Sequence, residues 1–361
     1  MRNLSIYFAV LLLCFSGGLS AAEAKKPPKV KTDKVKTQQA PSGPLYAKRP
    51  DVSDWAEQTA KVYQLDAKWV KAQLSQARMV PSITKLILPP TQISKKNWAA
   101  YQARFIEPKR IQAGLEFWKN NQALLERAEQ TYGVPPWLIV GIIGVETFYG
   151  QHTGNFRVLD ALSTLTFDFP KSHPRAAERQ AFFSKELAQF LVLAHQEKMK
   201  PSSIKGSYAG ALGLPQFMPT SWAKFAVDFD GDRRIDLFKN QADVIGSVAN
   251  YFKAFQWQSG MPTHYPVSFN RDQLEMDALM APDILPTFSV TNFVAKGAVL
   301  GEDALQHKGP LALIELLNGD EPPSYVAGTE NFYAITRYNW SSYYAMAVIE
   351  LGQAVADRLK N

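Results

Sequence analysis

The chain has 361 residues and a formal net charge of +7, and it is long enough to bury a sizeable core in more than one structural unit. The positive charge is concentrated in residues 25–50, where seven lysines and Arg49 stand against Asp33 alone, a surplus equal to the net charge of the whole chain. Residues 51–361 are therefore close to neutral, which argues against a nucleic-acid-binding domain.

The N-terminal end has the composition of an export signal. Arg2 precedes an apolar run at 6–15, and small residues suitable for cleavage follow it, so residues 1–24 are predicted to form a cleaved signal peptide. The single cysteine, Cys14, lies inside this run, and Leu13 stands where a lipid-anchor signal needs a small residue, so lipid anchoring is not expected. The mature chain then has no thiol, which excludes disulfides, thiolate metal sites and cysteine catalysis.

Residues 25–50 combine lysines with prolines and polar residues, a composition typical of a flexible linker. The composition favours a solvated spacer, and a weak electrostatic association with an anionic polymer or membrane surface is the alternative. Beyond this linker apolar residues recur at helical spacing. Two helices are expected within 51–78, another near 97–105, and one long helix from 108 towards 132.

The next segment is predicted to be a helix that is apolar on every side. Pro136 suits a first helical turn, residues 137–145 contain no polar side chain, and Gly150 can end the helix in the left-handed conformation. Gly141 and Gly144 lie three residues apart, so they would let another backbone or a ligand approach closely.

One ionisable residue, Glu146, lies in the last turns of this apolar helix. A carboxylate there loses hydration, so its pKa should rise and the group should stay protonated near neutral pH. This is the state that a general acid needs. The alternative is a buried glutamate that bonds a neighbouring side chain for structure alone.

Residues 205–219 are interrupted by three glycines too often for a stable helix. Polar Ser207 and Gln216 stand among small and apolar residues, a mixture that favours an inner loop lining a cleft. A plain packed turn explains the composition equally well.

Carboxylates then alternate at Asp228, Asp230 and Asp232, as at the start of an oxygen-rich calcium loop. Arg233 occupies the position where a standard EF-hand has glycine, and Lys239 the position where it has glutamate. The alternative is a solvated turn without an ion.

A helix is expected at 242–255. From residue 260 the composition changes to prolines and short β-type runs, including 287–290 and 332–336, so a small antiparallel β insertion is expected. A helix at 342–360 closes the chain.

Several of these motifs together resemble a known family. They are Gly-Val-Glu-Thr at 144–147, the glycine-rich segment 206–219, the loop after Asp228, the helix 244–252 and Tyr338-Asn339. In this order they are similar to the lytic murein transglycosylase B family, over residue 51 to the C-terminus. The resemblance implies a mainly α (α+β) fold, with a lysozyme-like helical core, an N-terminal helical part and a small antiparallel β insertion.

The resemblance also implies an activity, which is cleavage of the β-1,4 bond between N-acetylmuramic acid and N-acetylglucosamine in peptidoglycan. The products carry 1,6-anhydromuramoyl ends, and the enzyme is expected in the periplasm. The family's catalytic acid and base falls on Glu146. Its glycan-binding residues fall on Tyr101, Arg179, Ser207, Gln216, Tyr338, Asn339 and Tyr344. The segment 171–174, just before Arg179, departs from the family pattern.

No organic cofactor is implied, but a structural Ca²⁺ is. The calcium ligands of the family fall on Asp228, Asp230, Asp232, Arg234 (through its carbonyl) and Asp243. The implied partner is the glycan strand of peptidoglycan, with no nucleic acid.

The expected organisation follows the chain. It consists of the signal peptide 1–24, the basic linker 25–50, an N-terminal helical part 51–132, the catalytic core with the calcium loop 133–259, a β-containing domain 260–330 and a C-terminal segment 331–361 that returns to the core. Two other functions are kept as alternatives. One is a lysozyme-type hydrolase that uses water, and the other is a non-catalytic peptidoglycan-binding protein, against which the retained Glu146 weighs.

Overall fold

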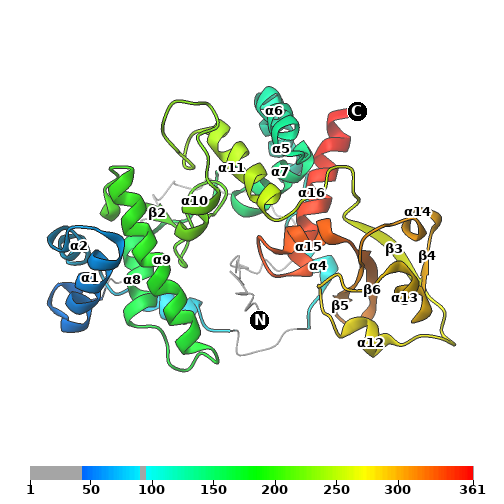
Figure 1. Cartoon of the computed structure of the whole chain (residues 1–361), viewed down its shortest axis with the longest axis horizontal. Helices are drawn as coiled ribbons and strands as arrows, with labels where there is room; N and C mark the ends of the chain where they lie inside the picture. The colour runs from blue at the N-terminus through cyan, green and yellow to red at the C-terminus, as the bar shows by residue number, and fades with distance from the viewer. Residues whose placement is uncertain (1–42, 90–94, 361) are drawn as a thin grey trace, which may run out of the picture.

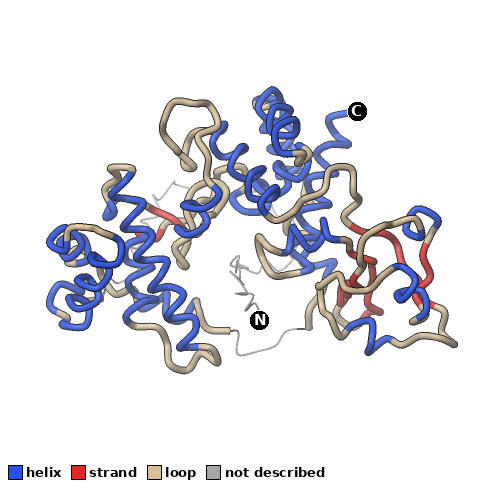
Figure 2. Tube along the Cα trace, viewed as in Figure 1, coloured by secondary structure: helices blue, strands red, loops and turns tan. Residues whose placement is uncertain are grey.

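The structure of the chain is a computed structural model that describes residues 43–89 and 95–360. The predicted signal peptide 1–24 and most of the linker 25–50 lie outside the described residues. Helices dominate the described part, and the four-stranded sheet lies at one end of the molecule (Figure 2). In the part of the chain that is described, no helix combines the length and the apolar character needed to cross a membrane.

The N-terminal helices lie at the opposite end from the four-stranded sheet, against two helices of the core (Figure 1). They are α1 (Pro50–Tyr63), α2 (Ala67–Leu74) and α3 (Pro81–Leu86), and they accompany α8 (Val158–Phe167) and α9 (Ala176–Gln196). The two helices expected within 51–78 are therefore confirmed. Not every apolar residue of these helices is buried, since Val62 on the outer face of α1 is 71% exposed.

Packed structure begins before residue 51. Tyr46 is 2% exposed, and its hydroxyl donates to Asp168 Oδ2 (2.5 Å). Arg49 donates to both carboxylate oxygens of Asp168 (2.7 and 2.8 Å). The end of the predicted linker is thus fixed to the residue that follows α8.

Side chains along one face of α8 hold the N-terminal part by its backbone. The amide of Arg78 donates to Asp160 Oδ1 (2.9 Å), and the amide of Val80 donates to Thr164 Oγ1 (3.0 Å). Asp160 is buried by these contacts, and burial raises its pKa although the Arg78 amide lowers it. This carboxylate, the next acid in the chain after Glu146, therefore has a structural partner.

The centre of the molecule is a close pair of helices distant in sequence, α7 (Pro136–Thr147) and α16 (Ser342–Lys360). A Cβ atom added at Gly141 would overlap the carbonyl oxygen of Val348, and one at Gly352 would overlap that of Trp137. Glycines thus allow the two backbones to touch, as expected for Gly141. The predicted closing helix at 342–360 is confirmed.

The single long helix expected from 108 towards 132 was wrong. Two helices, α5 (Pro108–Asn120) and α6 (Gln122–Tyr132), are separated at Asn121. The side-chain amide of Asn121 donates to the carbonyl of Phe117 (2.8 Å), and its backbone has left helical geometry (φ −123°, ψ 19°). Such side-chain bonding to the backbone competes with helix continuation.

The remaining helices of the core are α4 (Trp98–Gln102), α10 (Pro219–Phe225), α11 (Gln241–Ala254) and α15 (Glu330–Thr336). Of these, α11 packs against α7, α4 and α15 pack against α16, and α10 packs against α9 and α11. A two-stranded sheet pairs β1 (Phe156–Arg157) with β2 (Lys205–Gly206). The helix expected at 242–255 is confirmed.

A four-stranded antiparallel sheet forms the β insertion, in the order β4-β3-β6-β5. Its strands are β3 (His264–Phe269), β4 (Ala298–Leu300), β5 (Ala312–Asn318) and β6 (Glu321–Gly328), with the short helices α12 (Met276–Met280), α13 (Val290–Ala295) and α14 (Glu302–Leu305). A separate hydrophobic cluster, including Phe293 and Leu313, fills the space between them.

Both β-type runs named from the sequence were wrong in detail. Within 287–290 only Phe288 forms an isolated bridge, with Leu311, and residues 332–336 belong to α15. Thr329 caps α15 by accepting a hydrogen bond from the amide of Asn331 (3.2 Å), and a cap of this kind favours a helix at a short apolar run.

Candidate active site

The candidate site is built on the C-terminal end of α7, where the chain turns sharply after Thr147. Phe148 (φ 51°), Tyr149 (φ 56°) and Gly150 (φ 90°) are all left-handed, so the helix ends two residues before the predicted glycine stop. Left-handed geometry costs about 1–2 kcal/mol at each non-glycine residue. Close packing holds it here, because the Tyr149 hydroxyl lies against Gly144, where any Cβ atom would overlap it.

Glu146 lies just before this turn and is 7% exposed. Burial raises its pKa to about 7, while a hydrogen bond from the Tyr344 hydroxyl to Oε1 (2.6 Å) lowers it. Burial also raises the pKa of Tyr344, with the Glu146 charge as a further cause, so the tyrosine stays a donor. The predicted burial and raised pKa of Glu146 are therefore found in the structure.

A cavity of about 640 Å³ opens beside Glu146. Five of the predicted site residues line it together: Glu146, Ser207, Gln216, Tyr338 and Asn339. The residues come from α7, the 206–219 segment and the turn between α15 and α16, so folding brings together the motifs that are separated in sequence.

The 206–219 segment lines the cavity, as one of the two sequence interpretations predicts. Ser207 Oγ accepts hydrogen bonds from the amides of Ala209 (3.3 Å) and Ala211 (3.0 Å). Gln216 is left-handed (φ 52°), and its amide nitrogen donates to the carbonyls of Gly213 (2.8 Å) and Thr153 (3.2 Å). Its side chain is thus held in place before any ligand arrives.

The tyrosines differ in their access to the cavity. Tyr338 lines it and donates its hydroxyl to the carbonyl of Pro215 (2.6 Å). Tyr344 is 1% exposed, so it reaches the site through its bond to Glu146. Tyr101 does not line the cavity, but its proximity contributes to the raised pKa of Tyr344.

Arg179 also stands behind the cavity wall. Its guanidinium lies over the rings of Phe182 (5.3 Å) and Phe183 (5.1 Å). Burial lowers the pKa of Arg179, whereas the neighbouring Tyr208 raises it. Tyr208 itself lines the cavity.

Sequence reasoning missed part of the wall. Glu186 is fully buried at the cavity and accepts hydrogen bonds from the Thr220 amide (2.9 Å) and hydroxyl (2.6 Å). Lys185 and Lys224 lie beside it, and His152 stacks on the ring of Phe148 at an interplanar angle of 8°. The apolar stripe of α9 indicated only its core side, although Lys185 and Glu186 follow Phe182 at helical spacing.

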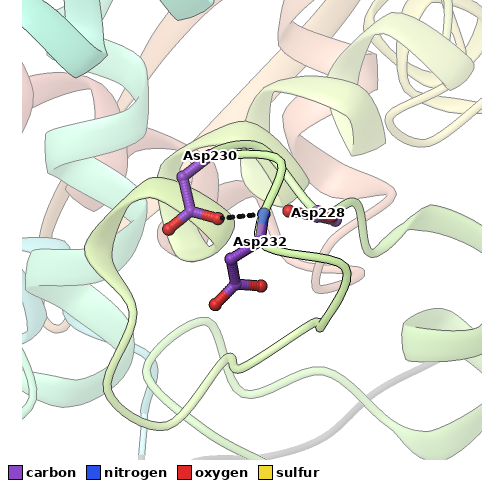
Figure 3. Close-up of side chains that lie close together, drawn as sticks. All are labelled: Asp228, Asp230 and Asp232. Atoms are coloured by element: carbon purple, nitrogen blue, oxygen red, sulfur yellow. Dashed lines mark hydrogen bonds between the residues drawn. The ribbon is translucent and has the colours of Figure 1, made fainter.

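The aspartate loop precedes α11 in the chain, and its three aspartates, drawn in Figure 3, are not among the residues that line the cavity. The carboxylates of Asp228, Asp230 and Asp232 offer ligand atoms within 4.8 Å of one another. Arg233, at the position where an EF-hand has glycine, adopts the left-handed conformation that glycine would supply (φ 70°). The donor set and the turn both fit a hard cation such as Ca²⁺.

The other two predicted ligands have different positions. Asp243 is buried outside the three-carboxylate cluster, and its two oxygens accept from the amides of Phe229 (2.9 Å) and Asp236 (2.8 Å). Asp243 therefore ties both ends of the loop to α11. The amide of Arg234 donates to Asp232 Oδ1 (2.8 Å), and the role of its carbonyl stays a prediction.

Comparison with known proteins shows one consistent similarity. The protein family described as "Transglycosylase SLT domain" matches residues 47–353. The membrane-bound lytic murein transglycosylase B of Escherichia coli (strain K12) is 39% identical over 322 residues, which cover 86% of this chain and 84% of that protein.

Solved structures give the same result. The soluble lytic transglycosylase SltB1 of Pseudomonas aeruginosa has a TM-score of 0.78 at 39% identity, covering 86% of this chain and all of that one. Escherichia coli Slt35 in complex with calcium has a TM-score of 0.75 at 38% identity, covering 88% and 96%. Pseudomonas aeruginosa SltB3 in complex with NAG-anhNAM-pentapeptide has a TM-score of 0.70 at 26% identity, covering 86% and 78%.

Proposed function

The chain belongs to the lytic murein transglycosylase B family and is a peptidoglycan lytic transglycosylase, and from this premise we propose that Glu146 is both the acid and the base of the reaction. The single observation that carries the proposal is a buried carboxyl group, with its pKa raised to about 7, at the wall of the cavity. At neutral pH a large share of such groups carries the proton that the leaving oxygen needs.

In the first step protonated Glu146 gives its proton to the glycosidic oxygen, and the bond from that oxygen to C1 of the muramyl sugar breaks. As that bond breaks, the acetamido oxygen of the same sugar forms a bond to C1, and the positive charge spreads over the resulting cyclic oxazolinium group. The Tyr344 hydroxyl, 2.6 Å from Oε1, stabilises the carboxylate that forms.

In the second step the Glu146 carboxylate takes the proton of the C6 hydroxyl, O6 forms a bond to C1, and the bond from C1 to the acetamido oxygen breaks, which restores the neutral acetamide. The ring closes as a 1,6-anhydro sugar, Glu146 regains its proton, and no water enters the product. Exclusion of water at a buried carboxyl group protects this step.

The cavity wall also disfavours a hydrolase, which generally needs a second working carboxylate. Among the described residues that line the cavity, the other acid is Glu186. Its oxygens accept two hydrogen bonds from Thr220, and burial raises its pKa. Glu186 therefore has a structural role, since its hydrogen bonds with Thr220 connect α9 to α10.

Glycan binding is assigned to the polar groups of the cavity. Ser207, Gln216 and Asn339 can bond sugar acetamido and hydroxyl groups, and Tyr338 offers a ring face. Tyr344 acts through Glu146. Arg179 lies over the ring of Phe182, which lines the cavity, whereas Tyr101 packs against Phe105, which does not line it.

The test is mass analysis of the products from purified sacculi. The wild-type enzyme should release products that each weigh one water less than those of a lysozyme on the same material. Glu146→Gln should bind glycan and stay folded but lose nearly all turnover, whereas Glu129→Gln, on the exposed face of α6, should remain active. Hydrated ends as the first product would support the hydrolase, and wild-type protein that releases nothing would support the non-catalytic alternative.

The aspartate loop is proposed as a structural Ca²⁺ site, in which the clustered carboxylates of Asp228, Asp230 and Asp232 bind the ion. The Arg234 carbonyl is proposed as a further ligand, and so is Asp243, whose oxygens also accept from the amides of Phe229 and Asp236. The calcium complex of Slt35, 38% identical, supports this assignment. A bound ion would relieve the repulsion among the carboxylates and stabilise the folded loop by mass action. Chelation should lower the melting temperature of the wild type and leave that of Asp228→Asn unchanged; an unmoved wild-type curve would contradict the site.

Export completes the proposal. Residues 1–24 act as a cleaved signal, the enzyme works in the periplasm, and the basic segment 25–42 adds weak attraction to anionic envelope surfaces. Deleting the segment should leave turnover of soluble glycan fragments nearly unchanged, because a weak electrostatic attraction is largely screened at physiological salt.

A further inference from the structure

Two lysines on the wall of the catalytic cavity have no part in the chemistry derived above. Lys185 belongs to α9 and Lys224 to α10, and both side chains are exposed where they line the cavity. Neither makes an ion pair within the part of the chain that the structure describes. Lysines without such a partner, at the wall of a substrate cavity, are available to a ligand.

The fold brings these lysines together. Helix α9 packs against α10, and both ammonium groups are near enough to Glu186 to lower its pKa, against the larger upward effect of burial. Glu186 does not cancel them, because it carries one charge against two and both its oxygens already accept from Thr220. The two lysines therefore form one positively charged part of the wall.

The charge balance of the whole cavity has the same sign. Among its described lining residues the cations are Lys185, Lys224 and Arg337, and the acids are Glu146 and Glu186. With Glu146 protonated for the first step, the cavity has two more positive than negative charges, His152 being counted as neutral. Such a cavity favours an anionic ligand group.

The sugar rings of murein are uncharged, so an anionic group must come from the substituent of the muramyl residue. That group is a carboxylate, either on the lactyl ether or on the peptide attached to it. The SltB3 complex contains a pentapeptide-bearing ligand, and a peptide ends in a carboxylate unless it is blocked. Phe182, Phe225 and Phe255 line the same cavity and give such a substituent apolar surface beside the lysines.

We propose that Lys185 and Lys224 form a carboxylate-binding subsite that makes the enzyme prefer murein strands with charged muramyl substituents. The subsite rests on the proposed function, since it acts on the substrate that Glu146 cleaves. It concerns binding, so it acts on KM more than on kcat.

The experiment compares three glycan strands of equal length. One carries peptide stems with free carboxylates, one carries the same stems with their carboxylates amidated, and one has been stripped of peptide so that only lactyl carboxylates remain. Release of anhydro products gives kcat and KM for each. The wild type should favour charged over amidated stems by about three- to tenfold in kcat/KM, the range for a pair of exposed charge contacts, and less at high salt.

In the Lys185→Gln/Lys224→Gln variant the ratio of kcat/KM for charged over amidated stems should fall to about one, because KM for the charged stems rises. The Lys185→Arg/Lys224→Arg variant should keep the wild-type ratio. Lys119→Gln, an exposed lysine of α5, is the matched control and should behave as wild type. If stripped strands also have a lower KM than strands with amidated stems, the lactyl carboxylate binds the subsite as well; otherwise only the stem carboxylate does. A wild type without preference, or a double glutamine variant that keeps it, would overturn the subsite. Neither outcome touches the proposed function, which fails only if anhydro products are missing from every strand.

Discussion

Burial of Glu146 should destabilise the folded protein at high pH, and Glu146→Gln should remove this effect. The folded-state pKa is about 7, against an ordinary value of 4.5. Between these pH values the folded protein binds more protons at this site than the unfolded chain does, so its stability falls as the pH rises. A glutamine keeps the acceptor for the Tyr344 hydroxyl but cannot ionise.

The size of the effect follows from the interval between the two pKa values. Each pH unit corresponds to about 1.4 kcal/mol, so the free energy of unfolding of the variant should exceed that of the wild type by about 3 kcal/mol above pH 7. This corresponds to a rise of about 5–10 °C in melting temperature. The gain should vanish at about pH 4, where the carboxyl group is protonated in both states.

Denaturant unfolding and thermal melting at several pH values between about 4 and 8.5 would measure the difference. Glu129→Gln, exposed on α6, controls for the general loss of one negative charge and should give an offset that does not change with pH. An equal gain for Glu146→Gln at both ends of the pH range would refute the reasoning, as would a wild type that is the more stable protein at high pH. In either case Glu146 would not be a carboxyl group held neutral by burial.

Three other changes test the neighbouring structure. Tyr344→Phe removes the hydrogen bond that lowers the pKa of Glu146, so loss of activity on the alkaline side should move up by about one pH unit in a kcat profile; an unchanged profile would contradict this. Arg233→Gly should raise the melting temperature by an amount equivalent to about 1 kcal/mol, because Arg233 is left-handed (φ 70°), whereas Arg234→Gly should not raise it. Gly141→Ala should cost about 3 kcal/mol in denaturant unfolding, since the added methyl group overlaps the facing backbone of α16, and a neutral result would show that the helices can separate.

The sequence determined the elements whose pattern is local and unambiguous. An apolar run without a polar side chain at 137–145, opened by Pro136, can only be a buried helix, and a carboxyl group at its end must lose water. Where a sequence pattern was compatible with two local structures, the prediction was wrong. The run 332–336 has β-type residues but is helical because Thr329 caps it, and Asn121 breaks an apolar period that continues on both sides.

The motifs of the sequence named most residues of the site, yet their contacts depend on packing between distant segments. Tyr344 lies 198 positions from the Glu146 carboxyl group that it bonds. The pair meets because α16 lies along α7, where glycines let the backbones touch. Lys185 and Lys224 likewise become one charged surface only when α10 packs on α9. The spacing of residues along a helix determines which face each residue occupies. Which other segment packs against that face is determined only by the tertiary structure that buries it.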